Sequence, residues 1–98
     1  MGYIEVPDVT LQMIIDAGII SPNTLIYNSF DESIVGTLNK DGSITLTVDG
    51  KVKNFPYPSG AARAIVNLSV NGWIFWKIKE NEVYYTLSSY KDRYYKKV

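Results

Sequence analysis

Cysteine and histidine are both absent from the 98-residue chain. Their absence excludes a cysteine nucleophile, a disulfide framework, a zinc finger and a serine–histidine triad. Histidine is also the side chain that most often transfers protons in enzymes. We therefore expect a protein that is not an enzyme, with no catalytic residue, no metal site and no cofactor.

Long apolar segments are missing as well. No run of about 18 apolar residues is present, which is the length that a membrane-spanning helix requires. The N-terminus lacks the charged and then apolar segment of a secretory signal, so we expect a cytoplasmic protein. The length and the 46% of hydrophobic residues suit one domain over residues 1–98 with a single modest core.

Net charge is absent too, because ten basic residues balance ten acidic ones. The two kinds are unevenly placed. Residues 1–76 hold four basic and seven acidic residues, a net charge of −3, whereas residues 77–98 hold six basic and three acidic residues, a net charge of +3. The second segment also contains five of the eight tyrosines. This asymmetry indicates either a patch that faces nucleic acid or a solvated final helix.

Local patterns predict an α+β fold, a small antiparallel sheet of about four or five strands with an N-terminal, a central and a C-terminal helix. The first helix is expected over residues 9–17, with Asp8 or Thr10 as cap and Gly18 as its end. Two Asp-Gly pairs predict tight hairpin turns. The strands expected around them cover residues 25–28, 33–38, 43–48 and 51–55.

The segment 55–79 holds the most distinctive residues. Ser59 is expected to cap a helix over residues 60–68, and Asn71-Gly72 is expected to form a turn with positive φ. An aromatic strand over residues 73–79 should then join the same sheet.

The C-terminal residues predict one more strand and a final helix. The strand covers residues 83–86, and the helix covers residues 87–98. Its apolar face is formed by Leu87, Tyr90, Tyr94 and Val98 at spacings of three and four residues.

Five motifs stand out along the chain: Ile14 to Thr24, Asp41-Gly42-Ser43-Ile44, Asp49-Gly50-Lys51, Tyr57-Pro58-Ser59-Gly60-Ala61-Ala62 and Asn71-Gly72-Trp73-Ile74-Phe75-Trp76. Together they resemble the RAMA domain, the "restriction enzyme adenine methylase associated" family. The resemblance runs over about residues 8–78, and residues 80–98 lie beyond it. Tyr57 stands where the family's Ser-Pro-Ser box has its first serine, a departure from the pattern. The resemblance implies a module that reads DNA, often modified DNA, beside restriction and methylation enzymes.

Each candidate site residue has a structural and a functional interpretation. Ser59 and the amides of Gly60 and Ala61 form either a plain helix cap or a phosphate site to which Arg63 adds charge. On a strand, Trp73 and Trp76 would face opposite sides, so at least one should lie in the core while the other stacks on a base. Asn71 belongs to a turn or pairs with an adenine edge.

The basic tail has two interpretations, and both stay open. Lysines and arginines interleaved with tyrosines suit a surface that follows a DNA backbone, and equally a helix that docks on a protein as an accessory or inhibitor. For DNA, neutralising ~3–5 phosphates predicts a slope of log affinity against log salt near −3 to −4. The predicted DNA contacts are Tyr57, Ser59, Gly60, Arg63, Asn71, Trp73, Trp76, Lys77, Lys91 and Arg93.

Overall fold

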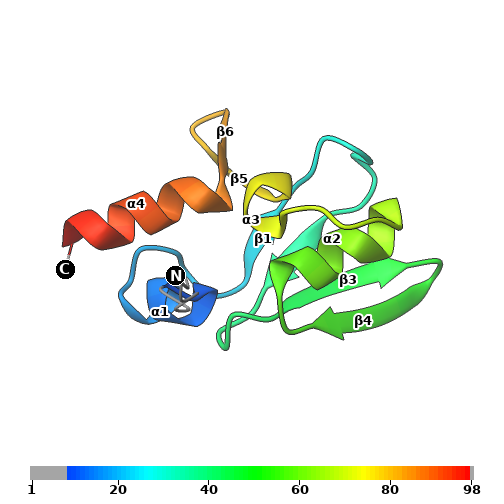
Figure 1. Cartoon of the computed structure of the whole chain (residues 1–98), viewed down its shortest axis with the longest axis horizontal. Coiled ribbons are helices and arrows are strands. Elements are labelled where there is room, and N and C mark those ends of the chain that lie inside the picture. Colours follow the sequence, from blue (N-terminus) through cyan, green and yellow to red (C-terminus); the bar gives the residue numbers. More distant parts are fainter. Residues whose placement is uncertain (1–8, 98) are drawn as a thin grey trace, which may run out of the picture.

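The computed structural model describes residues 9–97 (Figure 1). The expectations for Asp8 as a cap and for Val98 on the final helix lie outside the described residues. The chain has an α+β fold, as predicted. Its elements follow in the order α1 (Leu11–Asp16), β1 (Thr24–Ile26), β2 (Gly36–Leu38), β3 (Ile44–Val48), β4 (Lys51–Phe55), α2 (Pro58–Val66), α3 (Gly72–Phe75), β5 (Lys77–Glu80), β6 (Val83–Thr86) and α4 (Leu87–Lys97).

The first helix begins and ends close to the predicted residues. The hydroxyl of Thr10 accepts a hydrogen bond from the Met13 amide at 3.2 Å, which satisfies one of the free amides of the first turn. Gly18 follows the helix with φ of +80°, a conformation that glycine adopts without steric cost. α1 turns Leu11, Ile14 and Ile15 into the core.

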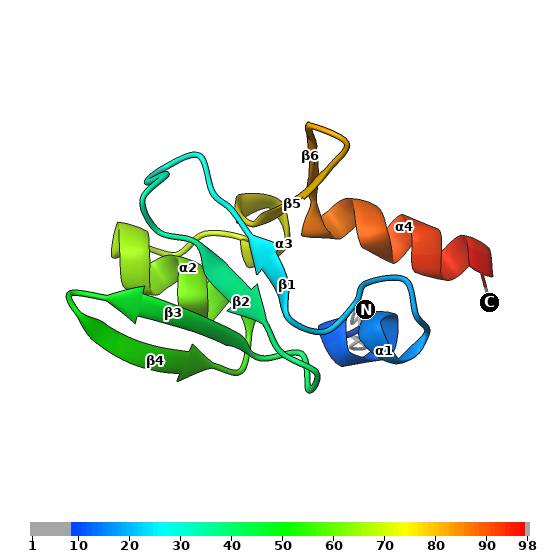
Figure 2. The same cartoon turned by 180° about the vertical axis from the view of Figure 1, so that it is seen from behind.

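The main sheet is an antiparallel meander in the order β1-β2-β3-β4. Asp49 and Gly50 both have positive φ, 52° and 75°, in the two-residue turn that pairs Val48 with Lys51. This is the hairpin that the Asp-Gly pair predicted. α2 covers one face of β3 and β4, and the opposite face is seen uncovered from behind (Figures 1 and 2).

The prediction of a strand over residues 73–79 was wrong for its aromatic half. Residues 72–75 form the short helix α3, and the strand begins only at Lys77. β5 then pairs with β6 in a separate two-stranded sheet, which touches the main sheet through one bridge between Tyr27 and Lys77. Tertiary contacts of α3, described below, outweigh the strand propensity of the aromatic residues.

Strand β6 and helix α4 match their predicted bounds closely. Leu87 and Tyr90 are buried and Tyr94 is partly buried, so these three form the predicted apolar face of α4. The helix lies beside α1, where the Lys97 ammonium donates a hydrogen bond to the Ala17 carbonyl at 2.8 Å (Figures 1 and 2). Among residues 9–97, no helix has the length and apolar character needed to cross a membrane.

One core cluster joins these elements. It includes residues from α1, the main sheet, α2, β5 and α4. The largest side chains that are fully buried in it are Trp76, Tyr90, Ile14, Ile26, Leu38, Ile44, Leu46 and Leu87.

Candidate functional site

The site is built on a close contact between α2 and α3. The indole N–H of Trp76 donates to the Pro58 carbonyl at 3.0 Å, and the Gly72 amide donates to the Ser59 hydroxyl at 3.0 Å. A Cβ at Gly72 would overlap the backbone of Pro58 and Ser59. Glycine is therefore required at position 72 so that the start of α3 can touch the start of α2.

This contact corrects the predictions for Asn71, Gly72 and Ser59. Asn71 has φ of −80°, and its side-chain oxygen accepts a hydrogen bond from the Trp73 amide at 2.9 Å, so it caps α3. Gly72 is not among the residues with positive φ. Ser59 is not the cap of α2, because that helix begins at Pro58 and its cap residue is Tyr57. A proline at the first helical position, where no amide is needed, moves the start upstream.

A cavity of about 590 Å³ opens beside this contact. Four of the predicted site residues, Tyr57, Ser59, Trp73 and Lys91, lie in its wall although they come from α3, α4 and the start of α2. The remaining lining residues are Val9, Thr10, Leu11, Gln12, Asp41, Gly42, Pro56 and Pro58. The volume falls within the range of small-molecule sites.

Aromatic and cationic groups meet in the wall of this cavity. The ammonium of Lys91 lies over the ring of Trp73, 4.2 Å from its centroid. Such a cation–π contact contributes roughly 0.5–1 kcal/mol at an exposed site and fixes where the charge lies. Tyr57 is 71% exposed and Trp73 is partly buried, so both rings are accessible from the cavity.

The positive start of α2 and the negative carboxylate of Asp41 both border the cavity. At one side, Pro58 and Ser59 line the cavity at the start of α2. The cap residue of this helix provides no side-chain acceptor for the amides of the first turn, so the helix end keeps its positive character. At another side, the Asp41 carboxylate accepts hydrogen bonds from the hydroxyl and amide of Ser43, which hold its pKa below the usual range. An anion is therefore favoured near α2 and Lys91 and disfavoured near Asp41.

The structure places three of the other candidates outside this cavity. Trp76 is fully buried, in agreement with the expectation that at least one tryptophan belongs to the core. Asn71 is the cap of α3. Arg63 is exposed further along α2, where it donates to the Ser69 hydroxyl at 2.7 Å.

Arg93 is held in a hydrogen-bonded ion pair that the sequence did not reveal. Its guanidinium donates to both carboxylate oxygens of Glu80 at 3.0 and 3.1 Å, and the Tyr90 hydroxyl donates to the same carboxylate at 2.6 Å. Arg93 and then Tyr90 lower the pKa of Glu80. Burial, followed by the hydrogen bond to Glu80, raises the pKa of Tyr90. The pair fixes α4 to β5.

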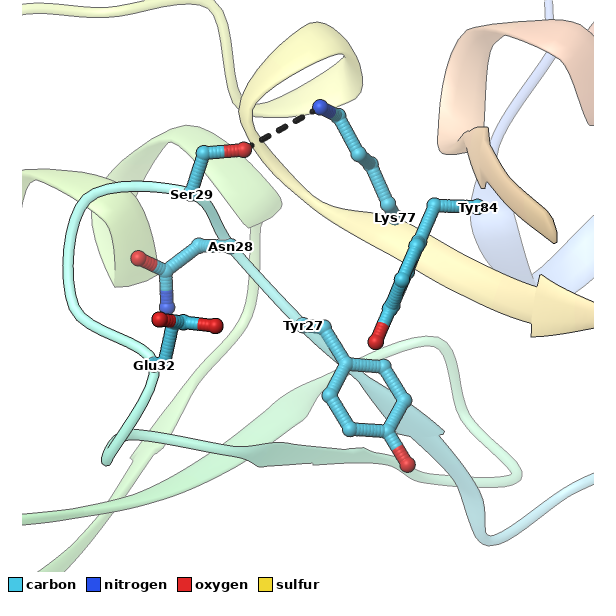
Figure 3. A pocket seen from close by; sticks show the side chains of 6 residues that line it. All are labelled: Tyr27, Asn28, Ser29, Glu32, Lys77 and Tyr84. Atoms are coloured by element: carbon cyan, nitrogen blue, oxygen red, sulfur yellow. Dashed lines mark hydrogen bonds between the residues drawn. The ribbon is translucent and has the colours of Figure 1, made fainter. Parts of the chain in front are cut away.

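Lys77 lies in a second cavity of about 400 Å³ (Figure 3). Its ammonium donates to the Ser29 hydroxyl at 3.2 Å. Tyr27 and Tyr84 also line this cavity, and sequence reasoning did not single them out. No local motif marks them, because they come together only when the two sheets meet.

Sequence reasoning also missed the wall of the first cavity that α1 provides. A Cβ at Gly42 would lie 2.8 Å from the Gln12 amide nitrogen, so the turn before β3 packs directly on the start of α1. Gln12 and Asp41 line the cavity as a result of this packing. Among the described residues, no group of three or more histidine, cysteine, aspartate or glutamate side chains is placed to hold a metal ion.

Comparison with protein families identifies the chain. The model of the family described as Restriction Enzyme Adenine Methylase Associated, RAMA, matches residues 4–98. The chain belongs to the RAMA family. This match extends past the residues 8–78 that carry the recognisable motifs, and it includes the C-terminal hairpin and helix. The family's name places the RAMA module in a restriction–modification context. No curated protein gives a significant match to the chain.

Proposed function

We propose that this RAMA-family chain is a DNA-binding module without catalytic activity, and that it reads a modified base at the cavity between α2, α3 and α4. The observation that supports the proposal is the convergence of Tyr57, Ser59, Trp73 and Lys91 on one cavity. The sequence alone predicts each of these residues as a DNA contact, and three separate segments of the chain provide them.

Each group has a role that its chemistry suits. Stacking of a base on an aromatic side chain contributes ~1–3 kcal/mol, and Trp73 and Tyr57 offer rings at the cavity. The phosphate attached to that base would meet the Lys91 ammonium or the amides at the start of α2. The Asp41 carboxylate opposite accepts hydrogen bonds, so it suits the amino group of a base better than a phosphate.

We expect the DNA affinity to depend less on salt than the slope of about −3 to −4 that the sequence suggested. Arg93 is engaged by Glu80, which leaves Arg63, Lys77 and Lys91 as the predicted basic contacts. Only Lys91 among them lines the cavity at Trp73. With one to three phosphates neutralised, log affinity should fall against log salt with a slope between about −1 and −3.

Anisotropy titrations test the proposal. Labelled duplexes without modification, with N6-methyladenine and with 5-methylcytosine are titrated at two salt concentrations. Lys91→Met should weaken binding and reduce the slope by about 0.9, whereas Lys53→Met, an exposed substitution on β4, serves as the matched control. Binding that does not depend on salt or on Lys91 would refute the proposed site. An absence of binding to every duplex would favour a protein-docking module that uses α4.

A further inference from the structure

The second cavity is built from two parts of the chain that pair directly. The amides and carbonyls of Tyr27 and Lys77 exchange two hydrogen bonds of 2.8 Å across the bridge between the sheets. Residues opposite each other in an antiparallel pair project to the same side. The side chains of Lys77 and Tyr27 therefore lie on the same side of the bridge, and both line the cavity together with Tyr84. In Figure 3 the Lys77 ammonium is directed toward Ser29, and the hydroxyl end of Tyr84 is directed toward the Tyr27 ring.

The loop that completes the cavity is held in place by a buried asparagine. The side-chain amide of Asn28 donates to the carbonyls of Asp31 and Ile34, both at 3.1 Å, and its oxygen accepts from the Asp31 amide at 2.7 Å. Asn28 is only 6% exposed. These bonds fix the loop that carries Ser29 and Glu32, so the polar groups of the cavity are positioned in advance.

The two aromatic rings form a right-angled wall. Tyr27 and Tyr84 have ring centroids 5.7 Å apart and an interplanar angle of 79°. A planar ring that stacks on one of them presents its edge to the face of the other, and both arrangements are ones that aromatic pairs prefer. Tyr84 is 51% exposed, so this wall is open to a ligand from solvent.

The charged groups occupy separate corners of the cavity. The Lys77 ammonium donates one of its three N–H groups to the Ser29 hydroxyl. Within residues 9–97, Lys77 makes no ion pair with Glu32, although both line the cavity. The cavity thus offers a cation with a hydroxyl at one corner, a carboxylate at another, and aromatic rings as a third wall (Figure 3).

We propose that this cavity binds a nucleoside monophosphate, either free or as the terminal unit of a strand. The phosphate contacts the Lys77 ammonium and the Ser29 hydroxyl, since charge-assisted hydrogen bonds to phosphate are the strong ones. The base packs against Tyr27 and Tyr84. The Glu32 carboxylate accepts hydrogen bonds from ribose hydroxyls, a role that acidic side chains have in other nucleotide sites. The site is distinct from the cavity at Trp73, so either proposal stands if the other fails.

Amide NMR spectra test this site with AMP, adenosine and ribose 5-phosphate as probes. AMP should shift the amides of residues 27–32, 77 and 84 and bind about tenfold more tightly than either fragment, because the fragments lack the phosphate or the base. Lys77→Met should reduce the affinity for AMP to that for adenosine. Tyr84→Ala should reduce it to that for ribose 5-phosphate, while Tyr84→Phe retains the ring and the affinity.

Two controls make the result decisive. Lys53→Met removes an exposed cation that does not line the cavity and should leave AMP binding unchanged. A single-stranded oligonucleotide with a 5′-phosphate competes with AMP if the strand end is the source of the ligand, whereas its 5′-hydroxyl form does not. If neither oligonucleotide competes, the free nucleotide is the ligand. The proposal is overturned if AMP shifts none of these amides, or if Lys77→Met binds AMP as tightly as the unchanged chain.

Discussion

Gly72→Ala should destabilise the fold more than its size suggests. The added methyl group would overlap the backbone of Pro58 and Ser59, and backbone atoms at the start of a helix cannot move aside as a flexible side chain does. α2 and α3 would have to separate. That separation breaks the hydrogen bond from the Trp76 indole to Pro58 and the one from the Gly72 amide to Ser59.

The magnitude follows from these two effects. Overpacking a well-packed contact costs typically ~1–3 kcal/mol, and leaving the buried indole N–H without its acceptor costs ~1–3 kcal/mol more. A total of roughly 2–6 kcal/mol is a large part of the ~5–15 kcal/mol by which domains of this size are stable. With a urea m-value of about 2 kcal/mol/M, the urea concentration at the midpoint of unfolding should fall by roughly 1–3 M.

Gly60→Ala is the matched control, because Gly60 lies in the first turn of α2 and a Cβ added there would have no atom within 4 Å. Alanine at this position should raise the free energy of unfolding by about 0.4–1 kcal/mol, since it restricts the unfolded chain. Urea titrations followed by circular dichroism compare the two variants with the unchanged chain. A loss below about 1 kcal/mol in Gly72→Ala would refute the argument that close approach requires glycine here.

Three further predictions concern stability. Arg93 and Tyr90 lower the pKa of Glu80 in the folded state. The ionised carboxylate therefore stabilises the fold above the unfolded pKa near 4.5, and this stabilisation is lost as the pH falls through the lower pKa of the folded state. The free energy of unfolding of the Glu80→Gln variant should therefore change less with pH in the acid range than that of the unchanged chain. Burial raises the pKa of Tyr90 above its ordinary 10.0, so stability should fall as pH rises past that value, and Tyr90→Phe should remove this loss. Thr10→Ala removes the hydroxyl that caps α1 at the Met13 amide and should lower the free energy of unfolding by ~1 kcal/mol; an unchanged urea midpoint would contradict this.

The meander was predictable because its signals are local. Asp49 and Gly50 adopt positive φ and connect adjacent strands with the shortest hairpin turn. Likewise, the spacing of Leu87 and Tyr90 predicted the buried face of α4. In these segments the structure follows from the residues of the turn and from the spacing of hydrophobic residues, both of which are local properties of the sequence.

The aromatic segment was not predictable by the same means. Trp73 to Trp76 favours a strand by composition, but the Asn71 cap and the bond from Trp76 to Pro58 hold it as a helix. The latter bond joins residues 18 positions apart. The pairing of Arg93 with Glu80 spans 13 positions, so local sequence patterns did not reveal that this predicted DNA contact is held in an ion pair. The convergence of Tyr57, Trp73 and Lys91 also depends on such distant contacts.

The most direct test of the proposed DNA site is tryptophan fluorescence on titration with a duplex that contains N6-methyladenine. Trp76 is fully buried, whereas Trp73 lines the cavity beside Lys91, so a base that enters should quench Trp73 alone. Quenching should exceed that with the unmodified duplex, and Trp73→Phe should abolish it while leaving the Trp76 emission in place. Equal quenching in Trp73→Phe, or no quenching with any duplex that binds, would contradict the assignment of the cavity as the base-reading site.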